Sequence, residues 1–301
     1  YNIRLFFKLL FVKKDILLAN DLDTLLPNYL VSKLFNKKIV YDSHELFTEV
    51  PELINRPFQQ NFWLKIEQFI VPKLIYAYTV CDSIAIHYNT IYNSKFRVIR
   101  NIPIKIEEHK KGMFPFNSKN KKIILYQGAL NKGRGLELMI ESMTFLDTAI
   151  FLIIGSGDIE KKLHALVKEL NLKEKVIFLD RISPNELQKI TPLADLGISM
   201  EEDLGLNYRY ALPNKLFDYI QAKIPVLVSN LNEMSNLVLT YNVGDIVLNR
   251  NPKDVAQQIT KILQKDKDFY RKQLEFAGNE LIWENESEKL IKLFKDVNSP
   301  I

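Results

Sequence analysis

The sequence predicts an α/β protein built from two doubly wound, Rossmann-like domains. Apolar runs of strand length alternate with amphipathic stretches of helix length, which is the pattern of βαβ units in parallel sheets. A polar segment, residues 105–121, interrupts this alternation and is interpreted as an interdomain linker. The length of 301 residues and a hydrophobic content of 47% allow two buried cores. We therefore expect domains at 1–104 and 122–278, followed by a closing helix within 279–301.

The first expected domain opens on an apolar stretch, residues 1–14, with basic interruptions. Arg4, Lys8, Lys13 and Lys14 interrupt it too often for a signal peptide, and no small-residue cleavage site follows. We expect a crossover helix packed on the sheet, with a membrane-surface helix as the alternative. Strands are then predicted at 15–19, 38–41, 78–81 and 96–99, and helices at 24–35, 58–76 and 83–92.

The second expected domain repeats the alternation. The helix at 184–190 has the best-defined start, because Ser183 and Glu186 form a capping-box pattern around Pro184 at the first helical position. Strands are predicted at 123–127, 149–154, 176–179, 196–200, 225–228 and 245–248, and helices at 136–145, 159–170, 184–190, 213–222 and 252–263. A last amphipathic stretch, 279–297, is predicted to be the closing helix.

Composition excludes several classes of protein. A single cysteine, Cys81, rules out an internal disulfide and a cysteine zinc site, and fits a reducing compartment. The net charge of +5 is too small and too evenly spread to indicate a nucleic-acid partner. No run of about 18 apolar residues exists, so no membrane span is expected. The acids Glu201, Glu202 and Asp203 lack a histidine at ligand spacing, so we predict a solvated loop and no metal site.

The stretch around residues 208–228 is the most informative part of the chain. It predicts a helix whose first turn carries Pro213 and Lys215, followed by a short apolar strand. Lys215 and Asp218 lie three residues apart and share one helical face. A helix N-terminus and a lysine suit a diphosphate, and a carboxylate one turn later can accept hydrogen bonds from ribose hydroxyls. By itself the pair fits an ordinary exposed ion pair equally well.

This block resembles the donor-binding helix of the GT-B glycosyltransferases, in the large retaining family 4 or "group 1" type. Many members carry P-x-K-x-x-E-Y-x-x-x-G-x-P-V here, and the matching positions in this chain are Pro213, Lys215, Asp218, Tyr219, Lys223, Pro225 and Val226. Lys223 stands where a glycine is usual. The resemblance extends over almost all 301 residues. It implies two Rossmann-like domains that face each other across a cleft, and a first domain that lacks part of its start.

A glycine-rich turn after the strand at 123–127 is the second candidate. Gly128 lets the backbone approach a ligand closely, and Arg134 follows in the same turn. The turn is similar to the family's G-R-L-x-x-x-K-G loop, in which arginine and lysine hold the donor diphosphate. Ala129 occupies the arginine position and Arg134 the lysine position, so Lys132 or Lys215 would have to compensate. Without the resemblance, an ordinary turn with solvated cations is equally consistent.

Two further candidates follow strands. His44, in the sequence Tyr41–Asp42–Ser43–His44–Glu45, resembles the histidine that retaining GT-B enzymes place beside the transferred sugar, and is the expected catalytic residue. Taken alone, a loop histidine is more often structural. Gly155 begins a G-x-G turn, which is weak evidence for nucleotide binding and receives a supporting role. The residues expected to bind the donor are Gly128, Arg134, Gly155, Asn214, Lys215 and Asp218.

The resemblance implies transfer of a hexose-type sugar from a nucleotide-sugar donor to a hydroxyl acceptor, with retention and with no cofactor or metal. The acceptor would be a saccharide or a lipid-linked compound in polysaccharide or glycolipid synthesis. The expected location is the cytoplasm, with a peripheral contact to an anionic membrane surface as a hypothesis. The same fold leaves two alternatives, a sugar-nucleotide 2-epimerase and a non-catalytic sugar-nucleotide-binding subunit.

Overall fold

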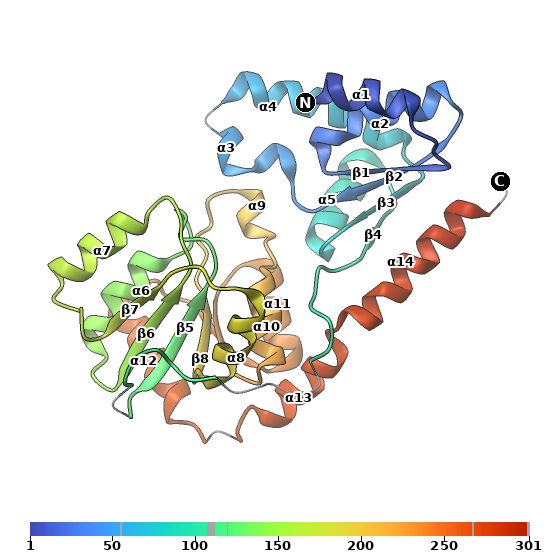
Figure 1. Cartoon of the computed structure of the whole chain (residues 1–301). Helices are drawn as coiled ribbons and strands as arrows, with labels where there is room; N and C mark the ends of the chain where they lie inside the picture. The colour runs from blue at the N-terminus through green and yellow to red at the C-terminus, as the bar shows by residue number, and fades with distance from the viewer. Residues whose placement is uncertain (55, 107–111, 119, 267, 300–301) are drawn as a thin grey trace. The chain divides into compact units, whose positions relative to one another are not determined.

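A computed structural model describes residues 1–54, 56–106, 112–118, 120–266 and 268–299 (Figure 1). The chain forms two compact units. The first unit comprises Tyr1–Asn101, Leu204–Ala211 and Glu284–Ile301, and the second comprises Ile102–Asp203 and Leu212–Trp283. The expected linker, 105–121, groups with the second unit, and its residues 107–111 and 119 lie outside the described part.

The first unit contains a four-stranded parallel sheet in the order β1-β2-β3-β4. Its strands are short and carry small or β-branched buried residues such as Ala19, Val40 and Ala77. The four strands expected from the sequence are therefore all present, although β3 begins and ends two residues earlier. Their bounds are β1 Ile16–Asn20, β2 Lys38–Ser43, β3 Tyr76–Thr79 and β4 Phe96–Val98.

One predicted helix of the first unit is shorter than expected, and two short helices, Pro51–Ile54 and Leu206–Arg209, were not predicted. The predicted helix at 58–76 ends at Ile70, since Pro72 cannot donate the next intrahelical hydrogen bond, and a 3₁₀ turn follows. The helices are α1 Asn2–Phe11, α2 Leu22–Leu34, α3 Pro51–Ile54, α4 Pro57–Ile70, α5 Asp82–Tyr92, α9 Leu206–Arg209 and α14 Trp283–Asn298, with 3₁₀ turns at Phe47–Glu49 and Val71–Lys73.

The opening helix α1 packs beside α2 (Figure 1), and none of its side chains is fully buried. The expectation that it covers the sheet was therefore wrong. Its side chains at Ile3, Phe7 and Phe11 are exposed. Lys14 closes the helix by donating to the carbonyl oxygens of Leu10, at 3.3 Å, and Val12, at 2.8 Å.

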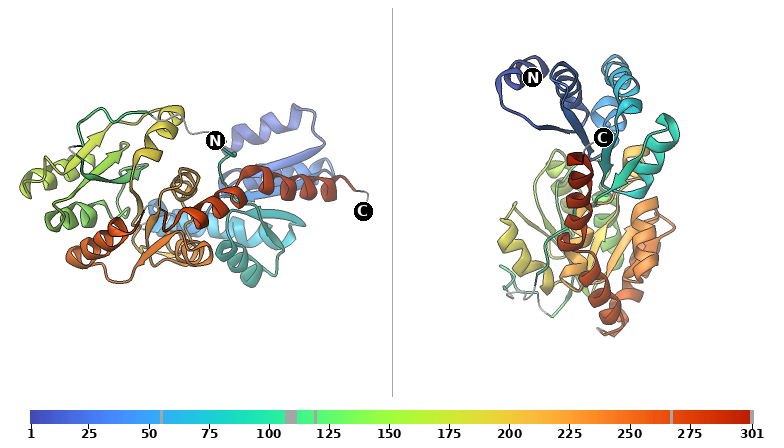
Figure 2. Two further views of the ribbon diagram at one scale, coloured as in Figure 1. Left: turned by 90° about the horizontal axis from the view of Figure 1, so that it is seen from below. Right: turned by 90° about the vertical axis from the view of Figure 1, so that its right-hand side faces the viewer.

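The closing helix α14, red in Figure 2, belongs with the first unit although it ends the chain. The Arg97 guanidinium lies 2.6 Å from the Asp296 carboxylate, and the Tyr76 hydroxyl donates to the Asp296 carbonyl at 3.1 Å. Glu286, which is buried, accepts from the Arg100 backbone N–H at 3.0 Å. These bonds attach the helix to β3, β4 and the segment after them. Among the described residues, no helix is both long and apolar enough to span a bilayer.

The second unit contains a six-stranded parallel sheet in the order β10-β9-β8-β5-β6-β7 (Figure 1). The first strand of this unit along the chain, β5, lies in the middle of the sheet, and later strands add to each side of it. This doubly wound order confirms the predicted fold class and reverses direction between β5 and β8. The strands are β5 Lys122–Gln127, β6 Ala149–Ile154, β7 Val176–Leu179, β8 Leu196–Ser199, β9 Val226–Ser229 and β10 Gly244–Val247.

The helices of the second unit cover both faces of this sheet. The predicted capping box is confirmed, because the Ser183 hydroxyl accepts from Glu186 N–H while the Glu186 carboxylate accepts from Ser183 N–H. Two helices, α11 and α13, were not predicted from the sequence. The helices are α6 Leu136–Ser142, α7 Glu160–Glu169, α8 Pro184–Ile190, α10 Asn214–Gln221, α11 Asn232–Tyr241, α12 Pro252–Gln264 and α13 Arg271–Glu280, with 3₁₀ turns at Met143–Phe145 and Thr191–Leu193.

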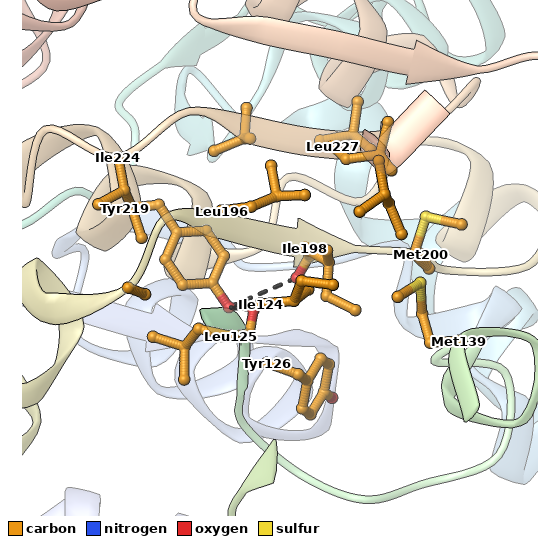
Figure 3. Packing of buried hydrophobic residues seen from close by; sticks show 14 of the residues in the cluster. Ile124, Leu125, Tyr126, Met139, Leu196, Ile198, Met200, Tyr219, Ile224 and Leu227 are labelled. Carbon is orange, nitrogen blue, oxygen red and sulfur yellow. Dashed lines mark hydrogen bonds between the residues drawn. The ribbon is translucent and has the colours of Figure 1, made fainter. Parts of the chain in front are cut away.

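A buried tyrosine separates the two central strands where the strand order reverses. The strands β5 and β8 pair only at Ile124–Leu196 and Leu125–Gly197 and then diverge. The Tyr219 hydroxyl fills the gap and donates to the Leu125 carbonyl oxygen at 3.2 Å (Figure 3). It also accepts from Gln127 N–H at 3.1 Å. Its ring lies against Gly197, where an added Cβ would come within 2.4 Å. The tyrosine side chain thus lies between β5 and β8 where the two strands diverge.

Candidate functional site

The candidate site in the second unit is centred on an ion pair at these strand ends. Lys215, in the first turn of α10, donates to Glu201 Oε1 at 2.6 Å, and Glu201 directly follows β8 and Met200. The Lys215 ammonium also lies 4.4 Å from the centre of the Tyr126 ring. Glu201 is fully buried and Lys215 is 9% exposed. Glu201 was predicted to lie in a solvated acidic loop, and that prediction was wrong.

Two arginines complete the cluster. Arg134 Nη1 lies 3.5 Å from the same Glu201 oxygen, Oε1. Arg250, which follows β10, donates to the carbonyl oxygens of Met200, at 3.0 Å, and Glu201, at 3.2 Å, and to the Ser229 hydroxyl at 2.6 Å. Two cations therefore contact the Glu201 carboxylate and the third contacts its backbone, so three cationic side chains gather around one buried carboxylate.

The electrostatics of the cluster follow from its burial. Burial acts to raise the pKa of Glu201, but the neighbouring Lys215, the Ser199 hydroxyl and Arg134 hold it below the usual value. Burial lowers the pKa of Lys215, and Glu201 opposes this effect while Arg134 adds to it. Ser199 donates to Glu201 Oε2 at 2.7 Å, so both carboxylate oxygens have partners. The 2.6 Å contact between Lys215 and Glu201 thus has the geometry of a buried ion pair.

Glycines bring two loops together beside this cluster. Gly128, with φ 140°, lies next to Lys215, and an added Cβ would lie 3.7 Å from Lys215 Cε. Gly155 has φ 148°, and a Cβ there would come within 1.9 Å of the Gly128 carbonyl oxygen. The turns after β5 and β6 can therefore pack backbone against backbone only with glycine at 155. The structure accordingly gives Gly155 a part in shaping the turn that contains Gly128.

A second polar group lies one helical turn along α10. Asp218 accepts a hydrogen bond from Gln127 Nε2 at 2.8 Å, and Gln127 Oε1 accepts from the Thr191 hydroxyl at 2.9 Å. Burial raises the pKa of Asp218 to about 6, although the Gln127 hydrogen bond opposes the shift. Asn214 is exposed at the first position of α10. The predicted residues Gly128, Lys215 and Asp218 therefore all adjoin the end of β5.

His44 lies in the first unit, directly after β2. Its Nε2 is 2.8 Å from Asp42 Oδ2, which also accepts from the Tyr78 hydroxyl at 2.8 Å. The His44 backbone N–H donates to Asp21 Oδ1 at 2.9 Å. The hydrogen bond to Asp42 raises the pKa of His44 despite its partial burial. A half-exposed imidazole with one nitrogen fixed by a carboxylate can donate or accept a proton through the other.

The acidic residue beside His44 is tied to a segment from the second half of the chain. Asn207, in α9, donates to Glu45 Oε2 at 3.1 Å and accepts from Leu46 N–H at 3.1 Å. Burial raises the pKa of Glu45, and Asn207 opposes the rise. The segment Leu204–Ala211 thus belongs structurally to the first unit, which the sequence pattern did not predict.

Sequence reasoning missed Glu201, Arg250 and Gln127 as members of the site. Gln127 is the last residue of a strand, and the other two come shortly after the carboxyl end of one. Because ligands of open α/β sheets bind at these ends, this placement could have identified all three. Within the described ranges, no group of three histidine, cysteine, aspartate or glutamate side chains could hold a metal ion.

Known proteins share both the fold and part of the sequence. The family model "Glycosyl transferases group 1" matches residues 109–279. An uncharacterised glycosyltransferase of Methanocaldococcus jannaschii is 24% identical over 192 residues, which are 58% of this chain and 45% of that protein. A 4-alpha-N-acetylgalactosaminyltransferase of Campylobacter jejuni, which acts on a diphospho-undecaprenol compound by its name, is 46% identical over 59 residues, 19% of this chain and 16% of that protein. The chain thus spans about half the length or less of these curated relatives.

Solved structures agree on the fold. Anabaena HepE in complex with UDP has a TM-score of 0.76 at 14% identity, covering 94% of this chain and 79% of that one. Sucrose-phosphate synthase from Thermosynechococcus elongatus has a TM-score of 0.75 at 17% identity, covering 94% and 73%. The two parallel sheets are those of the GT-B fold. With a family model that matches more than half of its residues, the chain belongs to the group 1 glycosyltransferases.

Proposed function

We propose that this chain transfers a sugar from a nucleotide-sugar donor to a hydroxyl acceptor with retention at the anomeric carbon. The observation that carries the proposal is the cluster of Lys215, Arg134 and Arg250 around the buried Glu201, at the ends of β5 and β8. Ligands of open α/β sheets bind where the strand order reverses, and these cations lie there. An excess of positive charge at this place suits a diphosphate.

The donor would be held by contacts to its diphosphate and its ribose. Lys215, Arg134 and the backbone around Gly128 and Asn214 would contact the diphosphate, and their charge would stabilise the phosphate as the glycosidic bond breaks. Asp218 would accept hydrogen bonds from the ribose hydroxyls. Gly155 supports this by shaping the turn at Gly128. The HepE structures with UDP and UDP-glucose are consistent with a donor of this class.

His44 would contact the transferred sugar. With Nε2 held by Asp42, its other ring nitrogen can hydrogen-bond a sugar hydroxyl. The acceptor oxygen then forms a bond to the anomeric carbon on the face that the leaving phosphate vacates. The acceptor proton passes to an oxygen of that phosphate, so the products are a glycoside and a nucleoside diphosphate. No cofactor takes part in this scheme, and the reaction would take place in the cytoplasm.

The test is a panel of nucleotide-sugar donors with saccharide and lipid-linked acceptors, assayed by release of nucleoside diphosphate and by NMR of the new anomeric centre. Lys215→Gln should lower kcat/KM by roughly ten- to a hundred-fold, the effect of losing one charged hydrogen bond to the transition state. Lys161→Gln is the matched control on an exposed side chain of α7 in the same unit. A product with inverted configuration would contradict retention.

Two other results would replace the proposal. Isomerisation of the sugar by the protein with donor alone would identify an epimerase. Nucleotide binding with neither transfer nor donor hydrolysis, over the whole panel, would identify a binding subunit; Ala129, which stands where relatives carry an arginine, favours that alternative.

We also propose that α1 contacts an anionic membrane surface, which would suit a lipid-linked acceptor. Ile3, Phe7 and Phe11 form an exposed apolar stripe at four-residue spacing, and the exposed Arg4 and Lys8 flank it. Such a helix face combines apolar area with charge that attracts acidic headgroups.

Flotation with vesicles of neutral lipid, compared with vesicles that contain an anionic lipid, tests the membrane proposal. The variant should neutralise Arg4, Lys8 and Lys13 and keep Lys14, because Lys14 caps the helix. Loss of the variant from anionic vesicles is expected. Equal flotation of variant and wild type would refute the contact.

A further inference from the structure

A buried carboxylate is in contact with the lysine that the proposed function assigns to the donor. Glu201 Oε1 lies 2.6 Å from Lys215 Nζ, and the carboxylate is fully buried. A buried ammonium without a partner would lose its proton, because burial disfavours its charged form. Lys215 can act as a cation toward an anion only while it is protonated.

The other charges near Lys215 do not supply this support. Arg134, from the turn after β5, repels the ammonium. The Tyr126 ring, from β5, lies 4.4 Å from it and carries no net charge. Asp218, one turn along the same helix, is bonded to Gln127. In the part of the chain that the structure describes, Glu201 is the negatively charged residue that the Lys215 ammonium bonds.

Glu201 is itself held in place on several sides. Ser199 donates to its second oxygen at 2.7 Å, and Arg250 donates to its backbone carbonyl at 3.2 Å. Arg134 approaches Oε1 at 3.5 Å. The position and the charge of this carboxylate are therefore stabilised by residues at or after the ends of three strands, β8, β5 and β10.

We propose that Glu201 is a positioning residue that keeps Lys215 charged and directed toward the Gly128 turn, so that the cation cluster binds a diphosphate over a wide pH range. The inference rests on the proposed function for the identity of the ligand only. Glu201 itself would not contact the ligand, because its two oxygens are occupied by Lys215, Arg134 and Ser199.

The first test measures the protonation of Lys215 without any ligand. Lysine labelled with ¹³C and ¹⁵N at the side-chain end is followed by NMR from pH 6 to 11, and the Lys215 signal is assigned by its loss in Lys215→Arg. In Glu201→Gln the signal should titrate lower by about one pH unit or more, since a carboxylate at contact distance is removed from a buried site. Glu202→Gln, at the adjacent position, should leave it unchanged.

The second test measures affinity for inorganic pyrophosphate and for UDP, GDP and ADP by calorimetry. Wild type should change little between pH 6.5 and 9, whereas Glu201→Gln should lose roughly ten-fold as Lys215 loses its proton. At pH 6.5 the variant should bind at least as tightly as wild type, because the cluster then has one negative charge fewer. A loss that is equal at both pH values would contradict the proposal.

The two tests separate this inference from the proposed function. If Lys215 titrates at the same pH in wild type and Glu201→Gln, the positioning role is refuted. If that titration shifts but wild type binds no diphosphate, the proposed function fails and the role of Glu201 stands. If Glu201→Gln fails to fold, Ser199→Ala takes its place, since it removes only the hydrogen bond to Glu201 Oε2. It should move the pH at which Lys215 titrates in the same direction by a smaller amount. No shift in Ser199→Ala would then refute the role.

Discussion

Asp218 offers a test in which stability and binding should move in opposite directions. Burial raises the pKa of this carboxyl from 3.8 to about 6. A raised folded-state pKa means that the ionised form is disfavoured in the folded protein. The loss of folding free energy from ionising Asp218 is absent below pH 3.8, grows between pH 3.8 and about 6, and is complete above about pH 6.

The structure sets the size of the effect. A shift from 3.8 to about 6 is 2.2 pH units, which at 1.36 kcal/mol per unit amounts to about 3 kcal/mol. Asp218→Asn removes the buried charge, and its amide oxygen can still accept from Gln127 Nε2. We therefore expect the variant to unfold with a free energy about 3 kcal/mol higher than wild type at pH 8, and with no difference at pH 3.5.

Urea denaturation from pH 3.5 to 8, followed by circular dichroism, measures this difference. Asp180→Asn is the control, because Asp180 is an exposed side chain of the same unit. In parallel, Asp218→Asn should weaken binding of a nucleoside diphosphate by roughly ten-fold, as a ribose hydroxyl loses a charged acceptor. A variant that is no more stable than wild type at pH 8 would refute the reasoning from burial.

Three further variants probe the second unit, each by urea denaturation. Lys223→Gly should raise the free energy of unfolding by about 1 kcal/mol, since Lys223 has φ 60°, a left-handed conformation that glycine adopts without strain; a loss of stability would contradict this. Tyr219→Phe should lower the free energy of unfolding by about 1–3 kcal/mol, because the buried Gln127 N–H loses its acceptor. An unchanged stability would mean that another acceptor replaces the hydroxyl. Gly197→Ala should lower the free energy of unfolding by about 2 kcal/mol, because the added methyl group clashes with the Tyr219 ring. In a protein that already carries Tyr219→Ala, the same substitution should lower it by clearly less.

The strand pattern of the sequence predicted most of the fold. All four strands of the first unit and all six of the second are present, because buried parallel strands read as continuous apolar runs. The expected helix at 58–76 was too long, since amphipathic periodicity continues past Pro72 although the hydrogen-bonding pattern cannot. The membership of α9 in the first unit depends on Asn207 and its partners Glu45 and Leu46, which lie about 160 residues away in sequence.

The site was only partly predictable for a related reason. Lys215 and Asp218 could be found because they occupy fixed positions in one helical motif. Glu201 was assigned to solvent because neighbouring acids in a loop usually are solvated, and local sequence does not reveal a lysine 14 residues away. Arg250 becomes part of the cluster only through the strand order, which places the end of β10 near the end of β8 by way of β9.

Calorimetric titration of the protein with UDP, GDP and ADP tests most directly whether the cation cluster binds a nucleotide diphosphate. We expect one of the three to bind wild type, and Arg134→Gln and Lys215→Gln each to weaken that binding by roughly ten-fold or more. Lys161→Gln should bind like wild type. Nucleotide binding that is unchanged in both cluster variants would contradict the account.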